Sequence, residues 1–290
     1  MTRPSGLDLY TRTAHTSSAR VIGAYSTSFG LASRLLPREE RGRIADVYAL
    51  VRVADEIVDG PASEAGLAAP DCLALLDELE QETLRALARG FSANLVVHAF
   101  AVTARETGIG EELLRPFFAS MRTDAQGASV FDPEAYRTYI HGSAEVVGSM
   151  CLRVFAREGA GVRIDEELEE GARRLGAAFQ KVNFLRDLRD DVERLGRVYL
   201  PGVDPVHFTE KDKDRFVREI DDDLAVARRA IVRLPPGSRR ATAAAAALFG
   251  ELNDRVRRTP AEELRRRRIS VPARTKVSLL TRAALGRVPA

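Results

Sequence analysis

The chain has only two cysteines, Cys72 and Cys151, and it has no uninterrupted apolar run long enough to cross a membrane. Two scattered cysteines exclude a disulfide framework or a zinc site, and they are typical of buried thiols in a reducing compartment. The first 20 residues are polar and lack an apolar core, so we do not expect a signal peptide. These absences predict a cytoplasmic protein.

Three further features are missing: alternating strand patterns, a Gly-x-Gly-x-x-Gly nucleotide fingerprint, and a linker rich in proline, glycine or serine. Their absence argues against a sheet-based fold, against a reductive step that uses nicotinamide, and against separate domains. Helical spacing is present instead, because apolar residues recur at i, i+3 and i+4 over residues 73–87 and 146–155. We predict one all-α domain over residues 1–290, a bundle of about eight to twelve helices with its active site in the interior.

One carboxylate pattern occurs twice, each time three or fewer residues after an arginine: Asp55 with Asp59, and Asp187 with Asp191. Residues four apart lie on the same face of a helix, so each pair offers two sets of oxygen ligands. If the two helices face each other, the carboxylates form a site for a hard cation. Mg²⁺ prefers oxygen ligands and completes its shell with water and substrate phosphate. We therefore predict that Mg²⁺ holds a diphosphate between two acidic helices.

Such a pattern alone is common on solvated helix faces. The neighbouring residues favour a site, because the first pair interrupts a strongly apolar stretch and like charges one turn apart repel each other. The second pair continues a stripe that begins with Gln180 and Asn183. Acids on an apolar face need a compensating partner, and a bound metal supplies one. We expect Asn183 to join the four aspartates as a metal ligand.

Two longer segments around these acids resemble the signatures of the squalene/phytoene synthase family. The first has Ser-Thr-Ser-Phe at residues 26–29, Leu-Leu-Pro at 35–37 and the acidic stretch 48–59. The second is the acidic stretch 180–191, followed by Gly-Arg-Val-Tyr-Leu-Pro at residues 196–201. The resemblance runs from about residue 20 to about residue 275, and motifs of this length in this order are specific.

The resemblance implies a helical bundle of the isoprenoid synthase type with a central cavity, and a Mg²⁺-dependent prenyltransferase that uses two or three ions with the diphosphate. Ionisation of an allylic diphosphate needs metals and cations around the leaving group, and an apolar pocket with aromatic faces around the allylic cation. Phe29, Phe179 and Phe184 are either such faces or plain core. The expected catalytic residues are the four aspartates and His141, and the expected substrate-binding residues are Ser26, Ser28, Phe29, Arg52, Gln180, Asn183, Arg186, Tyr199 and Arg267.

The chain departs from the family pattern at three positions. His141, with Glu145 one turn on, stands where relatives usually carry a tyrosine; Phe249 aligns with a diphosphate-binding tyrosine; and Tyr25 replaces a histidine or serine. Metal binding and ionisation look intact, whereas the later steps are open.

We therefore keep two readings of the reaction. The first is head-to-head condensation of two geranylgeranyl or farnesyl diphosphates through a cyclopropyl intermediate, as the resemblance implies. The alternative is transfer of one prenyl group to a non-isoprenoid acceptor such as an aromatic ring, with His141 accepting the proton. Cyclisation and hydrolysis are further outcomes of the same ionisation.

Positive charge is concentrated near the C-terminus, although the net charge is only +2. From Leu234 onward there are 13 Lys and Arg residues against four Asp and Glu, with a peak at residues 265–268. The segment is either a solvated helix end, a diphosphate clamp or a contact with an anionic membrane surface. The resemblance favours Arg267 or Arg268 as a diphosphate ligand.

A nucleic-acid-binding protein or a scaffold is the competing class for a basic all-α chain. The acids on apolar faces argue against it, and the basic segment lacks the interleaved aromatic residues of a base-stacking platform. We expect no nucleic acid partner. The expected partners are an allylic prenyl diphosphate and a second prenyl diphosphate or small acceptor, with peripheral membrane contact through the basic C-terminal segment.

Overall fold

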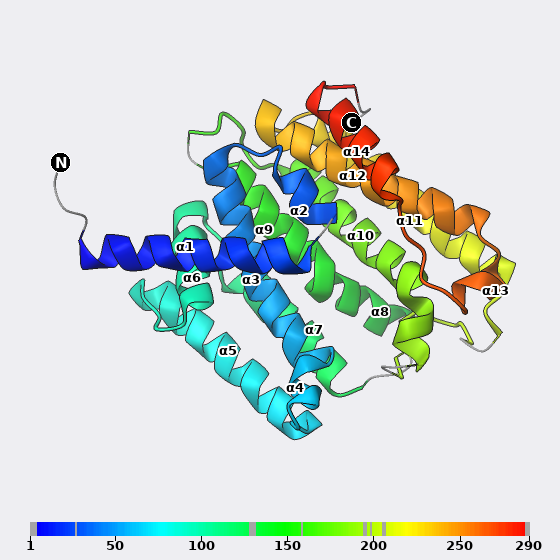
Figure 1. The fold of residues 1–290 in the computed structure, drawn as a ribbon, viewed down its shortest axis with the longest axis horizontal. Helices are drawn as coiled ribbons and strands as arrows, with labels where there is room; N and C mark the ends of the chain where they lie inside the picture. Colours follow the sequence, from blue (N-terminus) through cyan, green and yellow to red (C-terminus); the bar gives the residue numbers. More distant parts are fainter. Residues whose placement is uncertain are drawn as a thin grey trace.

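The computed structural model of the protein describes residues 5–26, 28–127, 132–157, 159–193, 196–197, 199–204 and 207–287. All regular elements in these ranges are helices, as Figure 1 shows, so the predicted all-α class is confirmed for them. In chain order they are α1 (Gly6–Tyr25), α2 (Ser28–Ser33), α3 (Arg38–Val58), α4 (Pro61–Glu64), α5 (Ala69–Arg89), α6 (Leu95–Thr107), α7 (Glu111–Ala125), α8 (Pro133–Ile140), the π-helical segment η1 (His141–Glu145), α9 (Val146–Phe155), α10 (Glu166–Glu193), α11 (Glu210–Ile231), α12 (Pro236–Arg258), α13 (Ala261–Leu264) and α14 (Ala273–Ala284).

There are more helices than the predicted eight to twelve, because α2, α4 and α13 are only four to six residues long. Local chemistry explains where the longer ones end. α6 begins after Asn94, whose side-chain oxygen accepts hydrogen bonds from the backbone of Val96 and Val97, and it stops at Gly108 in the left-handed conformation, with φ of 73°. α3 has Glu39 in its first turn, where the helix dipole favours negative charge.

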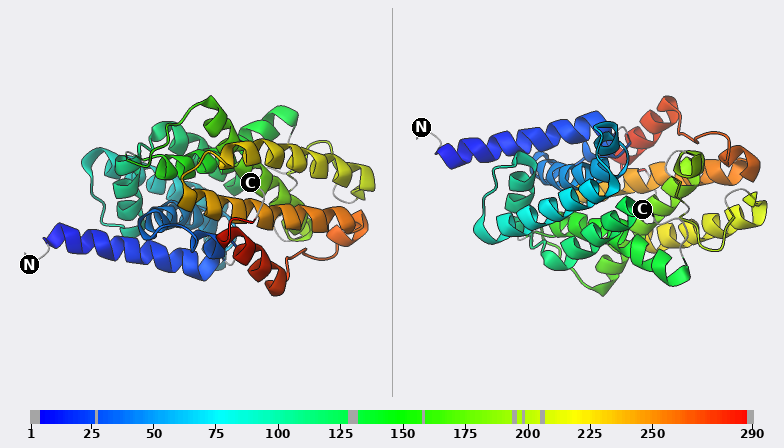
Figure 2. Two further views of the ribbon diagram at one scale, coloured as in Figure 1. Left: turned by 90° about the horizontal axis from the view of Figure 1, so that it is seen from above. Right: turned by 90° about the horizontal axis from the view of Figure 1, so that it is seen from below.

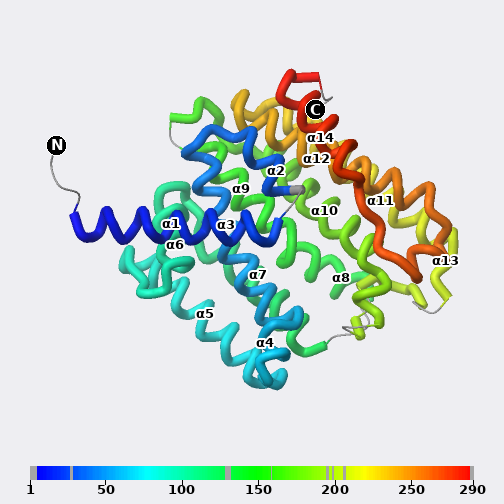
Figure 3. The backbone as a smooth tube through the Cα atoms, in the orientation of Figure 1, coloured from blue at the N-terminus to red at the C-terminus, as the bar shows by residue number. Residues whose placement is uncertain are grey.

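α10, with 28 residues, is the central helix of the bundle. It packs against η1 and α9 on one side and against α11 and α12 on the other, as Figures 1 and 3 show. Its buried residues include Leu168, Ala177, Val182 and Leu188, which lie on more than one face of the helix. A helix with several apolar faces must be covered by neighbours on several sides, so α10 divides the protein into two regions.

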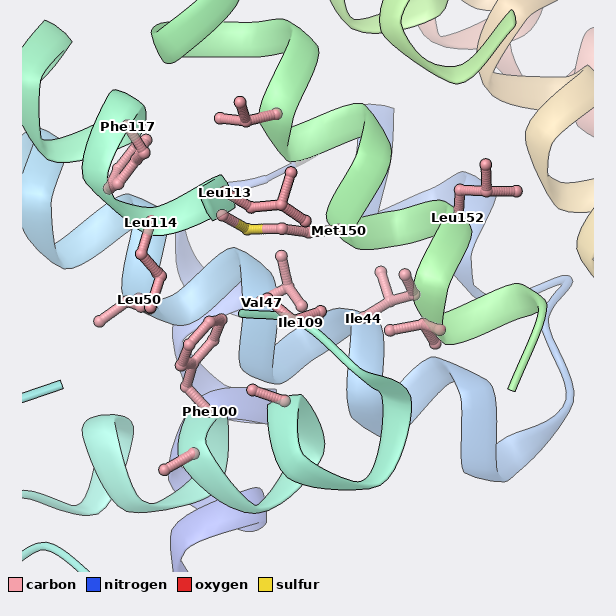
Figure 4. Close-up of a cluster of buried hydrophobic side chains, with 14 of the residues drawn as sticks. Ile44, Val47, Leu50, Phe100, Ile109, Leu113, Leu114, Phe117, Met150 and Leu152 are labelled. Carbon is pink, nitrogen blue, oxygen red and sulfur yellow. The ribbon is translucent and has the colours of Figure 1, made fainter. Parts of the chain in front are cut away.

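Each region has its own hydrophobic core. The first core joins α3, α5, α6, α7 and α9, and Figure 4 shows Leu50 and Val47 of α3 pointing toward Phe100, Leu114 and Met150. The second core joins α8, α10, α11 and α12. Fully burying a leucine or phenylalanine contributes about 1.5–3 kcal/mol, so each core contributes to stability through many such side chains. The first acid motif extends from the first core, and the second acid motif extends from the second.

α1 packs against α3 and α6, crosses over α3 in Figure 1, and projects beyond the rest of the bundle, as Figures 1 and 2 show. Buried polar contacts anchor it: His15 Nδ1 lies 2.7 Å from Asp46 Oδ2, which also accepts a hydrogen bond of 2.7 Å from the Thr103 hydroxyl. Asp46 is fully buried on α3, so its charge requires these partners. The anchored α1 ends at Tyr25 and delivers the chain to Ser26, at the edge of the cavity described below.

Glycines bring α10 unusually close to its neighbours. A methyl group at Gly148 of α9 would lie 2.2 Å from the C=O of Ala172, and one at Gly171 of α10 would lie 2.1 Å from the Cβ of Ala230 on α11. Helices usually pack with their axes about 8–10 Å apart, and small residues permit the lower end of this range. These three helices therefore form a tightly packed wall.

Candidate active site

A cavity of about 830 Å³ lies between the two cores. Asp55 and Asp59 from α3 line it together with Asp187 and Asp191 from α10, which confirms the prediction that both pairs face one cavity. Much of the remaining lining is apolar and comes from α2, α3, α9, α10, α11 and α12 and from the connections next to them, with Leu36, Ile44, Leu152, Phe155, Ile231 and Leu234 among its members. The cavity therefore combines acidic groups with a hydrocarbon-like compartment, as a ligand with a charged head and an apolar tail requires.

The first acid pair lies at the C-terminal end of α3. Burial, and next the nearby Asp59 carboxylate, raise the pKa of Asp55 from 3.8 to about 8. Asp59 is the C-cap residue of the helix, and its Oδ1 accepts a hydrogen bond of 2.8 Å from Arg197. Neighbouring groups therefore do not fully neutralise the negative charge of the two carboxylates, and a bound cation would do so.

The second pair is on α10. Arg186 donates hydrogen bonds to both oxygens of Asp187, and Arg268 Nε donates to Asp187 Oδ1 at 2.6 Å. Burial, next the Asp187 carboxylate and then Asp59 of the other motif together raise the pKa of Asp191 to about 7. An electrostatic effect of Asp59 on Asp191 means that the two pairs belong to one electrostatic site.

The donor set at these pairs fits Mg²⁺. Carboxylate oxygens dominate, and the predicted ligand Asn183 lines the cavity with its Oδ1 atom buried and without a hydrogen-bond partner. A buried amide oxygen without a partner costs about 1–3 kcal/mol, which a metal ion would recover. Among the described residues no three histidine, cysteine or acidic side chains lie so that they could hold a metal ion by themselves. Mg²⁺ typically binds with one or two carboxylates, water and substrate phosphates, so three such side chains are not needed.

Tyr199, predicted to bind substrate, belongs to a buried polar network that the sequence analysis missed. Its hydroxyl donates to Asp124 Oδ1 at 2.9 Å, and the Tyr139 hydroxyl donates to Asp124 Oδ2 at 2.8 Å. Arg197 donates to the Tyr199 hydroxyl at 3.2 Å. Burial raises the pKa of Asp124 to about 6, whereas Arg197 lowers it. The sequence could have identified Asp124 by its position three residues after buried Met121 on the apolar face of α7, because a carboxylate on such a face needs a partner.

Aromatic rings line the same cavity. The three phenylalanines proposed as cation-stabilising faces, Phe29, Phe179 and Phe184, all belong to its lining. Phe179 stacks on Phe249 with ring centroids 3.7 Å apart, and Phe184 stacks on Tyr199 at 4.3 Å. Because Phe249 has no hydroxyl, it contributes an aromatic ring rather than a hydrogen bond to the cavity lining.

Of the other predicted substrate-binding residues, Ser26, Arg52, Gln180 and Arg186 also line the cavity. Arg52 pairs with Glu56, and its guanidinium lies 4.6 Å from the centroid of the Tyr25 ring. The side chain of Ser28 lies outside the described residues. Arg52 therefore stands at the cavity with one carboxylate partner and an aromatic face, available to a diphosphate.

His141, predicted to be catalytic, is not among the residues that line the cavity, and its catalytic role stays a prediction. Its ring lies 3.0 Å from Glu145 Oε2, and 44% of the side chain is exposed. It opens the π-helical segment η1, in which the Val146 N–H donates to the His141 C=O five residues back. This wider turn shifts the faces that α-helical spacing predicts. Tyr139 and Ser143 line the cavity instead.

Arg267 also requires a correction. It donates to Glu263, lies 63% exposed and is not among the lining residues. Arg268 lines the cavity and contacts Asp187, so of the two candidate arginines it is the one at the site. Both lie beyond the end of α13, where helical spacing no longer predicts direction. Arg266 is paired with Glu262, so the basic peak is partly neutralised by its own acids.

In the part of the chain that the structure describes, no helix combines the length and the apolar character needed to span a membrane.

Comparison with known proteins agrees with this site. Residues 22–275 match the squalene/phytoene synthase family. The chain is similar to a 15-cis-phytoene synthase of a Paracoccus species, with 31% identity over 91% of this chain and 88% of the relative. It is also similar to a chloroplastic phytoene synthase 1 of Arabidopsis thaliana, with 29% identity over 72% of this chain and 48% of that longer protein.

Solved structures show the same fold. A crystal structure of a dehydrosqualene synthase superposes with a TM-score of 0.78 and 21% identity, covering 96% of this chain and 98% of the other. A squalene synthase of Alicyclobacillus acidocaldarius superposes with a TM-score of 0.72 and 22% identity, covering 86% and 95%. The family match spans both acid motifs and most of the chain, so the protein belongs to the squalene/phytoene synthase family and is a prenyltransferase of that type.

Proposed function

We propose that the protein condenses two allylic prenyl diphosphates head to head, with diphosphate released from each. The observation that carries this proposal is the joint lining of one cavity by two acid pairs and a large apolar surface. Relatives named phytoene synthase support it. Because no nicotinamide fingerprint is present in the sequence, we propose a product completed by loss of a proton rather than by addition of a hydride.

Different residues of the site bind the metal, the diphosphate and the allylic cation. Asp55, Asp59, Asp187 and Asp191, with Asn183, would hold Mg²⁺, which when bound neutralises the charge that develops on a departing diphosphate.

Arg52, Arg186 and Arg268 line the same cavity, where their guanidinium groups bind and orient phosphate oxygens by charge-assisted hydrogen bonds. The stacked rings of Phe184 and Tyr199 and the apolar lining exclude water from the allylic cation and present aromatic faces to it.

Transfer of one prenyl group to a separate acceptor was the alternative interpretation, and it rested on the departures from the family pattern at His141, Phe249 and Tyr25. The proton-accepting base in that alternative was His141, which is not among the residues that line the cavity, so the lining offers this alternative less support than it offers condensation. We therefore retain head-to-head condensation as the single proposed reaction.

The test is incubation of the purified protein with Mg²⁺ and geranyl, farnesyl or geranylgeranyl diphosphate, each separately, followed by mass spectrometry of apolar products. We expect one of the longer substrates to give a hydrocarbon with twice its number of carbon atoms, and chelation of Mg²⁺ to abolish it. A prenyl alcohol alone would indicate hydrolysis. A product that requires added cell extract would indicate a separate acceptor.

We also propose peripheral contact of α14 with an anionic membrane surface, which would accept apolar products. The support is chemical: Arg274 and Arg282 on α14 are exposed, as are Val277 and Leu285, and the sequence has no acid from Leu264 onward. Co-sedimentation with phosphatidylglycerol vesicles, but not with phosphatidylcholine vesicles, is the expected result. If the protein sediments with neither kind of vesicle, the contact is refuted.

A further inference from the structure

Arg197 is a buried arginine that the sequence analysis did not assign to the site. It follows α10 in the chain, and only 5% of it is exposed. A guanidinium group stays charged in proteins, so burying one requires acceptors for its N–H groups. The acceptors of Arg197 therefore show which parts of the molecule it holds together.

These acceptors belong to both acid motifs. The backbone N–H of Arg197 donates to the C=O of Asp191 at 2.9 Å, near the end of α10. Its guanidinium donates to the C=O of Val58 at 2.7 Å and to Asp59 Oδ1 at 2.8 Å, at the end of α3. One residue thus joins the C-terminal ends of the two helices that carry the acid pairs.

Helix polarity gives a physical reason for this arrangement. The last carbonyl groups of a helix lack partners within it, and the helix dipole places partial negative charge there. Asp59 is the C-cap of α3, and Asp191 lies in the last turn of α10, so both carboxylates stand at the unfavourable end of a helix. Arg197 supplies N–H donors to the open carbonyls and positive charge beside the acids.

The other side of the guanidinium is also held. It donates to the Tyr199 hydroxyl at 3.2 Å and lies 4.0 Å from Asp124 Oδ1. Asp124 comes from α7 and accepts hydrogen bonds from the hydroxyls of Tyr139 and Tyr199. Arg197 is therefore braced against a third helix and cannot follow Asp59 or Asp191 if either moves.

We propose that Arg197 is a positioning residue that fixes the spacing of the two acid pairs and thereby sets the affinity of the site for Mg²⁺ in the presence of diphosphate. The inference rests on the proposed function, because it concerns the same site. Arg197 makes no bond to the metal or the substrate in this role. Removing a group that orients metal ligands typically lowers metal affinity by about 10–100-fold.

Two other roles lead to different results. If Arg197 only stabilises the fold, its loss lowers the thermal stability and leaves Mg²⁺ affinity unchanged. If Arg197 occupies the place of a metal at Asp59, its loss removes a competitor, and Mg²⁺ binds more tightly.

The test follows thermal unfolding of the wild type and the Arg197→Gln variant at fixed inorganic diphosphate and rising Mg²⁺ concentration. We expect the Mg²⁺ concentration for half-maximal stabilisation to rise about 10–100-fold in the variant. Arg115→Gln is the matched control, since Arg115 on α7 pairs with Glu111 in an exposed ion pair and is not a lining residue of the cavity. Its half-saturation should equal that of the wild type.

Arg197→Lys keeps the test decisive if the glutamine variant does not fold. Lysine retains the charge, but its single ammonium group cannot reproduce the fork that reaches Asp59 and Val58 together. We expect near wild-type stability without Mg²⁺ and a half-saturation raised about 3–10-fold. An unchanged half-saturation, or tighter binding in either variant, overturns the proposal. If the wild type itself shows no response to Mg²⁺ with diphosphate, the proposed function fails instead.

Discussion

The two acid pairs have the same spacing in the sequence, but their arginine partners differ in origin. Asp59 of the first pair is held by Arg197, a buried residue that arrives from the other motif, 138 positions along the chain. Asp187 of the second pair is held by its own neighbour Arg186 and by Arg268, whose side chain is 59% exposed. Breaking a buried contact leaves a buried charge, whereas an exposed contact is exchanged at little cost. The first pair is therefore fixed in place, and the second keeps one exposed arginine, Arg268, that can turn to a substrate.

The largest effect should come from removing one carboxylate from each pair. Asp55→Asn and Asp187→Asn should each lower kcat/KM by at least about 100-fold, equivalent to about 2.7 kcal/mol, since an amide is a poorer Mg²⁺ ligand and carries no charge. Steady-state assays of hydrocarbon formation over a range of Mg²⁺ concentrations measure this loss. Circular dichroism should show the same helix content as in the wild type. Full activity of either variant at low Mg²⁺ would refute the role assigned to its pair.

The pH dependence of stability should show which carboxylates of the site lack neighbouring groups that neutralise their charge. The pKa of Asp55 in the folded protein, about 8, lies above its ordinary value of 3.8, and that of Asp191 is raised to about 7. The folded protein therefore binds more protons than the unfolded chain over this interval, and the metal-free protein should lose stability as pH rises from about 4 to about 8. Urea denaturation at several pH values in the presence of a chelator measures the slope.

Asp55→Asn should flatten that slope and stabilise the metal-free protein by about 1–2 kcal/mol near pH 8. The effect on the free energy of unfolding is no larger because solvent at the partly exposed site screens the charge. Asp214→Asn is the control, since Asp214 on α11 is an exposed acid that is not a lining residue of the cavity. If the stability of the metal-free wild type rises between about pH 5 and about pH 8, the raised pKa values of Asp55 and Asp191 are contradicted.

The smallest effect should separate the two neighbouring arginines. Arg268→Gln should raise the KM for the prenyl diphosphate about 5–10-fold, because it removes a charged donor at the cavity, in a position too exposed for a larger effect. Arg267→Gln should leave KM within about twofold, since its partner Glu263 is exposed and lies outside the cavity lining. Steady-state kinetics with each variant provides the comparison. If Arg267→Gln raises KM more than Arg268→Gln does, Arg267 rather than Arg268 binds the diphosphate.

The sequence alone was sufficient for the acid pairs, because their spacing and their apolar neighbours are local properties of two helices. It gave no warning of the π-helical segment that begins at His141, where the side chain takes another face than α-helical counting assigns, so the predicted catalytic role of His141 stays a prediction. It failed to separate Arg267 from Arg268 because both lie in irregular chain beyond α13.

Arg197 and Asp124 were missed for another reason. Each is a single charged residue in a charge-rich sequence, and they meet only because the chain after α10 returns to the ends of α3 and α7. That return depends on the packing of the whole bundle, which no local pattern encodes.

The close approach of α10 to its neighbours limits where the bundle can expand. A methyl group at Gly176 would lie 2.2 Å from the C=O of Ala144, and one at Gly171 would meet the Cβ of Ala230, so α10 has no free space toward η1 or α11. Tightly packed interiors have low compressibility. α2, α12 and α14, in contrast, meet through a small cluster made largely of alanines. We therefore expect any widening of the bundle that admits a long chain to occur at these outer helices, where substitutions would change the rate of product release without changing any residue that performs the chemistry.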